Sequence, residues 1–261
     1  MKRPRLFSTN AVVLRSAEFG EADRLLTLYT AALGKVRALA KGVRKIRSRK
    51  AGHLEPFTET RVQLAEGRTF LIVTQAEAIH THHTLRKDLH LLGLAAYIAE
   101  LADRFIGEGE ELPGFYVQIS AALKRLETIP DKRLVVRYYE MRLLDAAGFR
   151  PELRQCVVCG AVIRPEPQFF SVQQGGVLCP KCGAASPEAV PVSVDALRYL
   201  RHFQRSGFAE AARARPSPAT HAEMERLMQA FITHVLERRL NSTRFIRRVK
   251  GLASKPPTKR E

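Results

Sequence analysis

The chain has 261 residues, of which 45% are hydrophobic and 26% charged, and its formal net charge is +17 at pH 7. This length predicts two or three domains with cores of their own, and the absence of a window of about 18 uncharged apolar residues argues against a membrane span. Arg15 interrupts the apolar residues near the basic start, which argues against a secretory signal. We therefore expect a soluble, cytoplasmic protein.

The positive charge is concentrated toward both ends of the chain. Residues 1–80 carry 15 Lys and Arg against 7 Asp and Glu, and residues 191–261 carry 15 against 6, whereas residues 81–150 carry 10 against 10. A general enrichment in arginine would not leave the middle of the chain balanced. The distribution favours a polyanion such as nucleic acid as the binding partner.

The first 80 residues have the pattern of a small β barrel. Short apolar runs predict strands at residues 10–15, 24–30, 35–40, 58–64 and 69–75, and the glycines at 20, 34, 52 and 67 mark the connections. Five strands over this length fit an OB-fold, whose sheet face and loops bind nucleic acid strands, with an SH3-like barrel as the alternative. We expect residues 1–80 to form an OB-fold DNA-binding domain.

Residues 81–253 are expected to form a mainly helical domain. Apolar residues at spacings of three and four predict helices at residues 85–105, 115–127, 132–147 and 221–240. Gly148 is placed to cap the third of these, and Pro151 blocks its continuation. Residues 254–261 contain two prolines and three basic residues, and we expect them to be a disordered tail.

The densest positive charge lies between residues 35 and 50, where eight cations occur in sixteen residues with no acidic residue among them. In the predicted strand, Lys35 and Arg37 point to one face while Val36 and Ala38 point to the other. Past Gly42 we expect a mobile loop that follows a DNA backbone through Coulomb attraction and counterion release. The candidate DNA contacts are Lys35, Arg37, Lys41, Arg44, Lys45, Arg47, Arg49 and Lys50.

No aromatic residue occurs between Tyr29 and Phe57, so the basic stretch cannot itself provide the stacking surface that single-strand binders often use. Phe19, Phe57 or Phe70 are the candidates for that role. The stretch alone therefore predicts backbone contact with little base specificity. A solvated loop, or a nuclear localisation signal, remains the alternative interpretation.

All four cysteines of the chain occur in two C-x2-C pairs, each followed by glycine and separated by nineteen residues. This spacing predicts one structural Zn²⁺ held by four thiolates in a closed tetrahedral shell: Cys156, Cys159, Cys179 and Cys182. Phe169, Phe170 and Val177 lie between the pairs and predict a small hairpin, which needs the metal in order to fold. We expect residues 151–190 to be a zinc-finger insertion in the helical domain.

Two disulfides or a redox C-x-x-C are the alternatives for these cysteines, but nothing indicates an oxidising compartment, and a redox motif needs no second pair. A zinc deaminase is excluded because no proline precedes the second cysteine pair in the way its signature requires. Four further histidines lie near a strand-to-helix junction without an acidic ligand pattern in the sequence, and surface or packing roles are expected for them: His80, His82, His83 and His90.

We find no phosphate-binding loop, dinucleotide fingerprint, nucleophile elbow or clustered acidic motif. The chain is therefore expected not to be an enzyme. A zinc-containing enzyme that modifies nucleic acid and an RNA-associated zinc-ribbon protein stay open as alternatives.

The order of several motifs resembles the RecO family of bacterial recombination mediators. Within residues 11–57 these are an E-x-D-R turn, a G-K-x-x-x-x-A-K-G-x-R strand and loop, and an L-x-P-F segment. The segments YIAELADRF, YYEMRLLDAAGFRPELRQCVVCG and RRLNSTRFI continue the match along the chain. The resemblance spans nearly the whole sequence.

This resemblance implies an OB-fold N-terminal domain, a helical C-terminal domain and, as in some members, a zinc-binding insertion. It implies a bacterial, nucleoid-associated protein that binds single- and double-stranded DNA, anneals complementary strands and uses no nucleotide. With RecR it would help to load RecA onto strands coated by single-stranded DNA-binding protein, with a functional link to RecF. The contact with single-stranded DNA-binding protein would lie in the helical domain. By position, four cations are implied as DNA contacts: Lys35, Arg37, Lys41 and Arg44.

Overall fold

The computed structural model describes residues 6–237, 246 and 249. The described chain divides between Pro130 and Asp131 into two compact units. The predicted boundary at residue 80 is the last residue of the barrel, but the three helices that follow the barrel belong to the same unit. The predicted tail at 254–261 and nearly all of the RRLNSTRFI segment lie outside the described residues.

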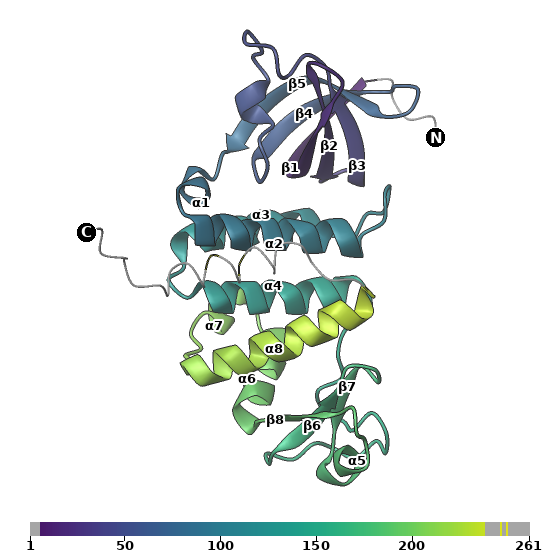
Figure 1. Cartoon of the computed structure of the whole chain (residues 1–261), viewed down its shortest axis with the longest axis vertical. Coiled ribbons are helices and arrows are strands. Elements are labelled where there is room, and N and C mark those ends of the chain that lie inside the picture. Colours follow the sequence, from purple (N-terminus) through teal and green to yellow (C-terminus); the bar gives the residue numbers. More distant parts are fainter. Residues whose placement is uncertain (1–5, 238–245, 247–248, 250–261) are drawn as a thin grey trace, which may run out of the picture. The chain divides into compact units, whose positions relative to one another are not determined.

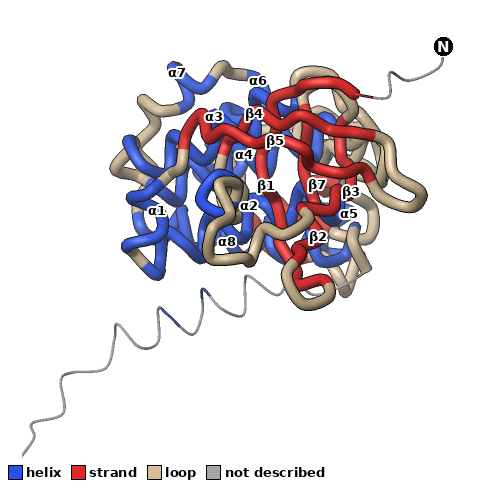
Figure 2. The backbone as a smooth tube through the Cα atoms, turned by 90° about the horizontal axis from the view of Figure 1, so that it is seen from above, coloured by secondary structure: helices blue, strands red, loops and turns tan. Residues whose placement is uncertain are grey.

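The first unit begins with a closed five-stranded barrel in the order β1-β2-β3-β5-β4 (Figures 1 and 2). All its neighbouring strands are antiparallel except β3 and β5, which pair in parallel through only two residue pairs. This confirms the predicted OB-type barrel of five strands. The strands are β1 (Leu6–Phe19), β2 (Asp23–Thr30), β3 (Gly34–Ala40), β4 (Glu59–Ala65) and β5 (Leu71–His80).

Strand β1 is much longer than the predicted residues 10–15. Its first part pairs with β4 and its second part with β2, and the register shifts between Val13 and Arg15. The residues of β1 beyond Arg15 are mostly exposed. The predicted strand therefore ends too early, because these residues extend past the core and only Ala17 and Phe19 among them are apolar.

The core of the barrel takes residues from every strand and also from the long connection between β3 and β4. Val43 and Leu54 of that connection are 1% and 0% exposed, and both belong to the barrel core. The connection also contains a short 3₁₀ helix, η1 (Ala51–His53). It is a loop, as predicted, but its two buried residues fix it to the barrel at both ends.

Helices α1 (His83–Lys87), α2 (Leu89–Phe105) and α3 (Phe115–Thr128) complete the first unit, and α2 and α3 lie across one end of the barrel (Figure 1). Asp88 caps α2 by accepting from the N–H groups of His90 and Leu91. The connection between α2 and α3 packs on β3 so closely that a Cβ on Gly34 would lie 1.9 Å from the Glu110 carbonyl oxygen. This contact explains why position 34 requires glycine.

The second unit packs helices α4, α6 and α8 around one core and carries a small three-stranded sheet in the order β7-β6-β8. Its elements are α4 (Lys132–Ala146), β6 (Gln168–Ser171), β7 (Gly176–Leu178), α5 (Pro180–Ala184), β8 (Val190–Val192), α6 (Val194–Arg205), α7 (Phe208–Ala211) and α8 (Pro218–Val235). The predicted hairpin is confirmed as β6 and β7.

Helix α8 begins three residues before its predicted start because Ser217 caps it and Pro218 occupies its first turn. Helix α6 is absent from the sequence-based prediction, although its apolar residues follow helical spacing. Among the described helices, none combines the length and the hydropathy needed to cross a bilayer.

Candidate nucleic-acid interface and metal sites

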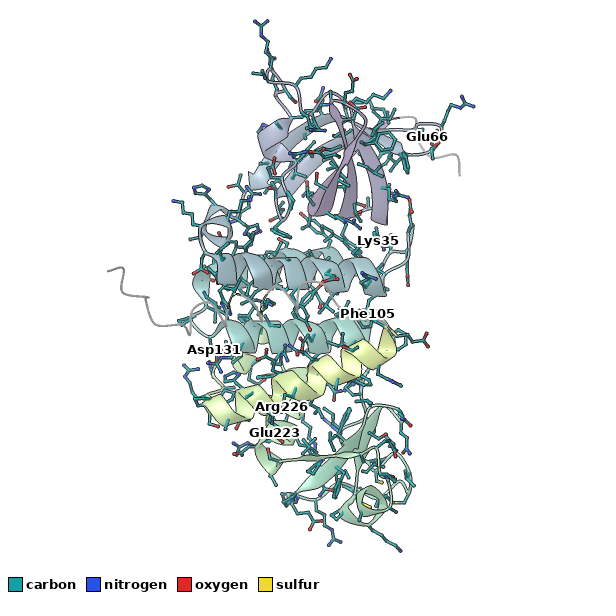
Figure 3. The ribbon with its side chains drawn as sticks, in the orientation of Figure 1. Lys35, Glu66, Phe105, Asp131, Glu223 and Arg226 are labelled. Atoms are coloured by element: carbon teal, nitrogen blue, oxygen red, sulfur yellow. The ribbon has the colours of Figure 1, made fainter. Side chains whose placement is uncertain are left out.

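Lys35 is the first cation of the basic stretch, and it faces the protein. Its ammonium donates to the Asp103 backbone carbonyl at 2.5 Å and to the Asp103 carboxylate at 3.2 Å, and its side chain is 12% exposed (Figure 3). The alternation predicted for this strand is correct, since Val36 and Ala38 are buried on the opposite face. Lys35, however, already has an anionic partner at the end of α2.

Arg37 is exposed and lies over the ring of Phe70, which in turn contacts a second aromatic ring. Its guanidinium carbon is 4.8 Å from the centroid of the Phe70 ring, and Phe70 meets Phe19 edge to face with centroids 6.1 Å apart. Phe19 is 43% exposed. We call these three residues the aromatic–arginine cluster. The stacking groups that the basic stretch lacks are thus brought to it from the end of β1 and the β4–β5 connection.

Phe57, the third aromatic candidate, lies elsewhere. Phe57 is 9% exposed, its backbone has φ +68°, and its N–H donates to the Val13 carbonyl at 2.7 Å. A non-glycine residue with positive φ is uncommon and marks a constrained turn. Phe57 therefore closes the β3–β4 connection instead of offering a free ring.

The loop after β3 is fastened to the turn between β1 and β2. The Asp23 carboxylate accepts from the Gly42 N–H at 2.7 Å, and the Arg44 N–H donates to the Ala22 carbonyl at 2.9 Å. Arg24 forms an ion pair with Glu55 at 2.8 Å. The E-x-D-R turn therefore holds both ends of the β3–β4 connection in place.

The cations of this loop differ in their partners. Arg44 pairs with Glu18 at 3.1 Å, and the Lys50 ammonium donates to the Val73 carbonyl at 3.0 Å. Burial lowers the pKa of Lys50, opposed by the nearby Asp23 carboxylate. Within the part of the chain that the structure describes, four exposed cations of the loop form no ion pair: Lys41, Lys45, Arg47 and Arg49.

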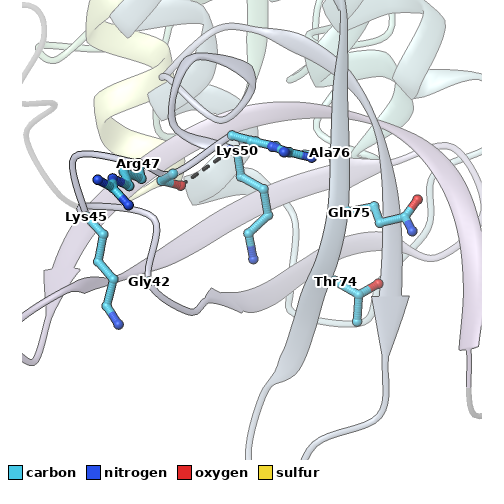
Figure 4. A pocket seen from close by; sticks show the side chains of 9 residues that line it. Gly42, Lys45, Arg47, Lys50, Thr74, Gln75 and Ala76 are labelled. Carbon is cyan, nitrogen blue, oxygen red and sulfur yellow. Dashed lines mark hydrogen bonds between the residues drawn. The ribbon is translucent and has the colours of Figure 1, made fainter.

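Part of the loop and strand β5 enclose a basic pocket of about 560 Å³ (Figure 4). The loop contributes its cations to one wall, and the polar edge of β5 forms the other. The residues that line the pocket are Gly42, Lys45, Arg47, Ser48, Arg49, Lys50, Thr74, Gln75 and Ala76. A pocket with cations on one side and hydroxyl and amide groups on the other suits a phosphate backbone.

The four cysteines of the second unit converge. Their sulfur atoms all lie within 4.8 Å of one another, and the sulfur atoms of Cys159 and Cys179 are 3.8 Å apart. A tetrahedron with Zn–S distances of about 2.3 Å places its sulfur atoms about 3.8 Å apart. The four thiols can therefore hold one metal ion of this size.

Backbone geometry explains the glycine that follows each cysteine pair. Gly160 has φ +72° and donates its N–H to the Cys156 carbonyl at 2.8 Å. Gly183 donates in the same way to the Cys179 carbonyl, and the Phe169 ring lies so close that a Cβ on Gly183 would be 2.2 Å from it. The two tight turns aim all four sulfur atoms at one point.

The cysteine thiols affect one another's ionisation. Burial opposes ionisation of Cys156, but hydrogen bonds from backbone N–H groups of Cys159, Cys179 and Val158 lower its pKa to about 6. The thiol of Cys179, then burial and the other thiols, raises the pKa of Cys182 to about 12. Four mutually repelling thiolates need a cation among them, as the chemistry of a metal site requires.

A second group of metal-ligating side chains occurs in the first unit, and the sequence did not indicate it. The ligand atoms of His80, His82 and Glu127 lie within 4.8 Å of one another. Surface or packing roles are expected for the two histidines from the sequence, because the neighbouring acidic residues follow no metal-ligand pattern. Glu127 reaches them from the last turn of α3, and no local spacing could have revealed this.

These features define a class of protein: an OB-type barrel with a basic loop and an aromatic–arginine cluster, joined to a helical unit with a four-cysteine site. Two family models match the chain, "Recombination protein O N terminal" over residues 1–82 and "Recombination protein O C terminal" over residues 86–244. The chain belongs to the RecO family.

Curated relatives agree with this assignment. A DNA repair protein RecO of Roseiflexus sp. (strain RS-1) is 41% identical over 94% of this chain and 86% of the relative. Proteins of the same name from Desulforudis audaxviator and Dehalococcoides mccartyi (strain ATCC BAA-2266 / KCTC 15142 / 195) are 39% and 34% identical over 95% and 91% of this chain, and over 98% and 94% of their own lengths. Membership of this family supports a role in recombinational DNA repair.

Proposed function

We propose that this protein is a recombination mediator that binds single- and double-stranded DNA through its barrel. The observation that carries the proposal is the aromatic–arginine cluster beside a loop with four exposed cations that form no ion pair with any described residue. The cluster and the loop lie at the end of β1, on β3, and in the β3–β4 and β4–β5 connections. We call this combined area the barrel surface.

The two parts of the barrel surface supply different interactions. The exposed Phe19 ring and the Arg37–Phe70 pair offer planar groups on which unpaired bases stack, and such stacking contributes about 1–3 kcal/mol per base. Lys41, Lys45, Arg47 and Arg49 neutralise phosphates and release counterions, whatever the sequence. Single strands would use both parts, and duplexes mainly the cations.

Three cations of the basic stretch have a weaker claim to DNA contact. Lys35 is held by Asp103, so we assign it a structural role and leave it out of the barrel surface. Arg44 and Lys50 bind Glu18 and the Val73 carbonyl, and each would have to exchange that partner for a phosphate. Arg37 stays a candidate DNA contact, because its stacking on the Phe70 ring does not use the N–H donors of its guanidinium.

We further propose that the four cysteines hold one Zn²⁺ with a structural role. The support is the chemistry of four thiolates at the separation expected for tetrahedral zinc. Because all four ligands come from the protein, the shell has no open position for a reacting molecule. The metal would fasten the small sheet and its two cysteine turns, which bury little apolar surface of their own.

Beyond DNA binding, we propose that the protein anneals complementary strands and, with RecR, helps to load RecA onto DNA coated by single-stranded DNA-binding protein, in functional connection with RecF. Family membership supports this proposal. We propose that the protein does this without a nucleotide and without catalysing a reaction. Annealing requires two single strands to be held close together. The loop cations can bind the phosphates of both strands, and the aromatic rings can stack with unpaired bases.

An annealing assay tests the proposal most directly. Complementary labelled oligonucleotides, coated with single-stranded DNA-binding protein, should anneal faster when this protein is added. RecR with RecA should then give RecA filaments on the coated strand. No acceleration of annealing, or binding of RNA in strong preference to single-stranded DNA, would contradict the proposal.

A further inference from the structure

We propose that His80, His82 and Glu127 form a binding site for a divalent transition metal of the zinc class, separate from the four-cysteine site. His80 is the last residue of β5, His82 precedes α1, and Glu127 lies in the last turn of α3. The site would fasten the end of the barrel to the helices of the first unit. The four cysteines, in contrast, all belong to the second unit.

The three ligand atoms meet at one point. His80 Nε2 and His82 Nδ1 each lie 2.8 Å from the same oxygen of Glu127, Oε2. The two imidazole rings stand edge to face, with centroids 4.2 Å apart. Two imidazoles and one carboxylate are a ligand set that zinc accepts and that magnesium and calcium do not prefer.

The surrounding residues hold this arrangement in place. Thr84 donates its hydroxyl to the other carboxylate oxygen, Oε1 of Glu127, at 2.6 Å. Such a contact orients a carboxylate in the way that outer hydrogen bonds orient metal ligands. His82 is 1% exposed and has a left-handed backbone, with φ +49°. An uncommon backbone conformation in a buried residue indicates that the position of its ring is constrained.

Access to the site is open on one side. The His80 side chain is 44% exposed, while those of Glu127 and His82 are 12% and 0% exposed. An ion can therefore enter past His80. Ligand atoms at about 2.1 Å from a tetrahedral ion are about 3.4 Å apart, so the two nitrogens must each move by a few tenths of an ångström from Oε2. The exposed His80 ring has the freedom to do this.

A simple hydrogen-bonded clasp is the competing explanation of the same geometry. In that case one Oε2 would accept from both rings, and no metal would be needed. The other nitrogen of the buried ring, His82 Nε2, has no hydrogen-bond partner among the described residues under either explanation, so only a metal titration separates the clasp from a metal site. With three protein ligands, a bound ion would keep one coordination position for water or an anion on the His80 side.

The test is a metal titration of the full-length protein. Protein whose cysteine site is first filled with one equivalent of Zn²⁺ is dialysed against Co²⁺, and the metals are counted. We expect a second ion per chain, with the visible absorption of cobalt bound by nitrogen and oxygen and with no sulfur-to-cobalt charge transfer. Two ligand variants, His80→Ala and Glu127→Gln, should each reduce the affinity for the second ion by more than about tenfold.

The matched control is His83→Ala, which removes an exposed neighbouring histidine outside the cluster. It should keep both ions. Circular dichroism of each variant without added Co²⁺ establishes that it is folded. A wild-type protein that holds one ion per chain in excess Co²⁺, or a second ion retained by both ligand variants, overturns the proposal in favour of the hydrogen-bonded clasp.

Discussion

The guanidinium carbon of Arg37 lies 4.8 Å above the ring of Phe70, so a strand cation and a loop aromatic form one unit on the outside of the barrel. Arg37 is exposed and Phe70 is half-buried, so neither belongs to the barrel core. A pair of planar groups exposed in this way is available to a third planar group. This relationship leads to the first prediction.

Phe70→Ala should weaken binding of single-stranded DNA by about 5- to 150-fold, which corresponds to about 1–3 kcal/mol for one stacked base. Duplex affinity should change much less, because paired bases do not stack on a protein surface. Fluorescence anisotropy with a labelled oligonucleotide and its duplex measures both. Arg61→Ala, which removes an exposed cation from β4, serves as the control and should leave the ratio of the two affinities unchanged.

The loop cations should set the salt dependence of binding. Replacing Lys45 and Arg47 by Ala removes two phosphate contacts, and each lost contact should reduce the slope of log affinity against log salt by about 0.7 for a single strand. The double variant of Arg61 and Lys87 removes the same charge from exposed positions outside the barrel surface. An equal loss of slope in both double variants would show that only net charge matters.

Lys35→Ala should act on stability more than on DNA binding. It removes a partly buried ion pair and a charged hydrogen bond to the end of α2, which we expect to cost about 2 kcal/mol in the free energy of unfolding. Asp103→Asn should cost less, because the carbonyl contact of Lys35 remains. Urea denaturation gives both values. If Lys35→Ala leaves stability unchanged and strongly reduces DNA affinity, Lys35 contacts DNA and its structural role is contradicted.

Glu59 should be a second stabilising residue of the first unit. It is 6% exposed, and its carboxylate accepts from Tyr116 at 2.7 Å, Ser120 at 2.9 Å and Lys124 at 2.7 Å, all on α3. Glu59→Gln leaves a buried amide with an unsuitable donor among these groups. We expect a loss of about 1–3 kcal/mol by urea denaturation, whereas Glu77→Gln on exposed β5 should change stability little.

Removal of the cysteine-bound metal should loosen the second unit first. Cys159→Ser together with Cys182→Ser should lower the metal content by one zinc per chain and speed amide exchange in residues 151–190. Amide exchange in the barrel should stay as slow as in the wild type. Faster exchange throughout the chain, or an unchanged zinc content, would contradict a structural ion held by these cysteines.

The sequence predicted those features that depend on local spacing. The alternation of Val36, Ala38 and their neighbours placed strand β3, and the two C-x2-C pairs located the cysteine site. Features that depend on tertiary pairing were out of reach. The contact of Arg37 with Phe70, the ion pair of Lys35 and the approach of Glu127 to the histidines each join segments that no periodicity links.

The composition of the basic stretch does not show which of its cations are available for DNA contact, whereas their neighbours in the structure do. All eight cations look alike in the sequence, but the structure separates them by partner: Lys35 faces Asp103, Arg44 faces Glu18, and Lys45 faces solvent. Helix α6 illustrates another limit. Its buried residues Leu197, Leu200 and Phe203 have helical spacing, but the helix is short and polar residues separate these three apolar positions.

The short pairing between β3 and β5 determines which fragments of the protein can be expressed as stable domains. Where β5 does not reach, the backbone of Lys35 donates to Glu110 at 3.1 Å and accepts from Gly109 at 2.7 Å, so the α2–α3 connection covers that stretch of strand. A fragment that ends at residue 80 would lose this cover and present an unpaired strand edge, which invites aggregation. An expression fragment for the barrel should therefore run to about residue 130, so that it includes the α2–α3 connection and α3.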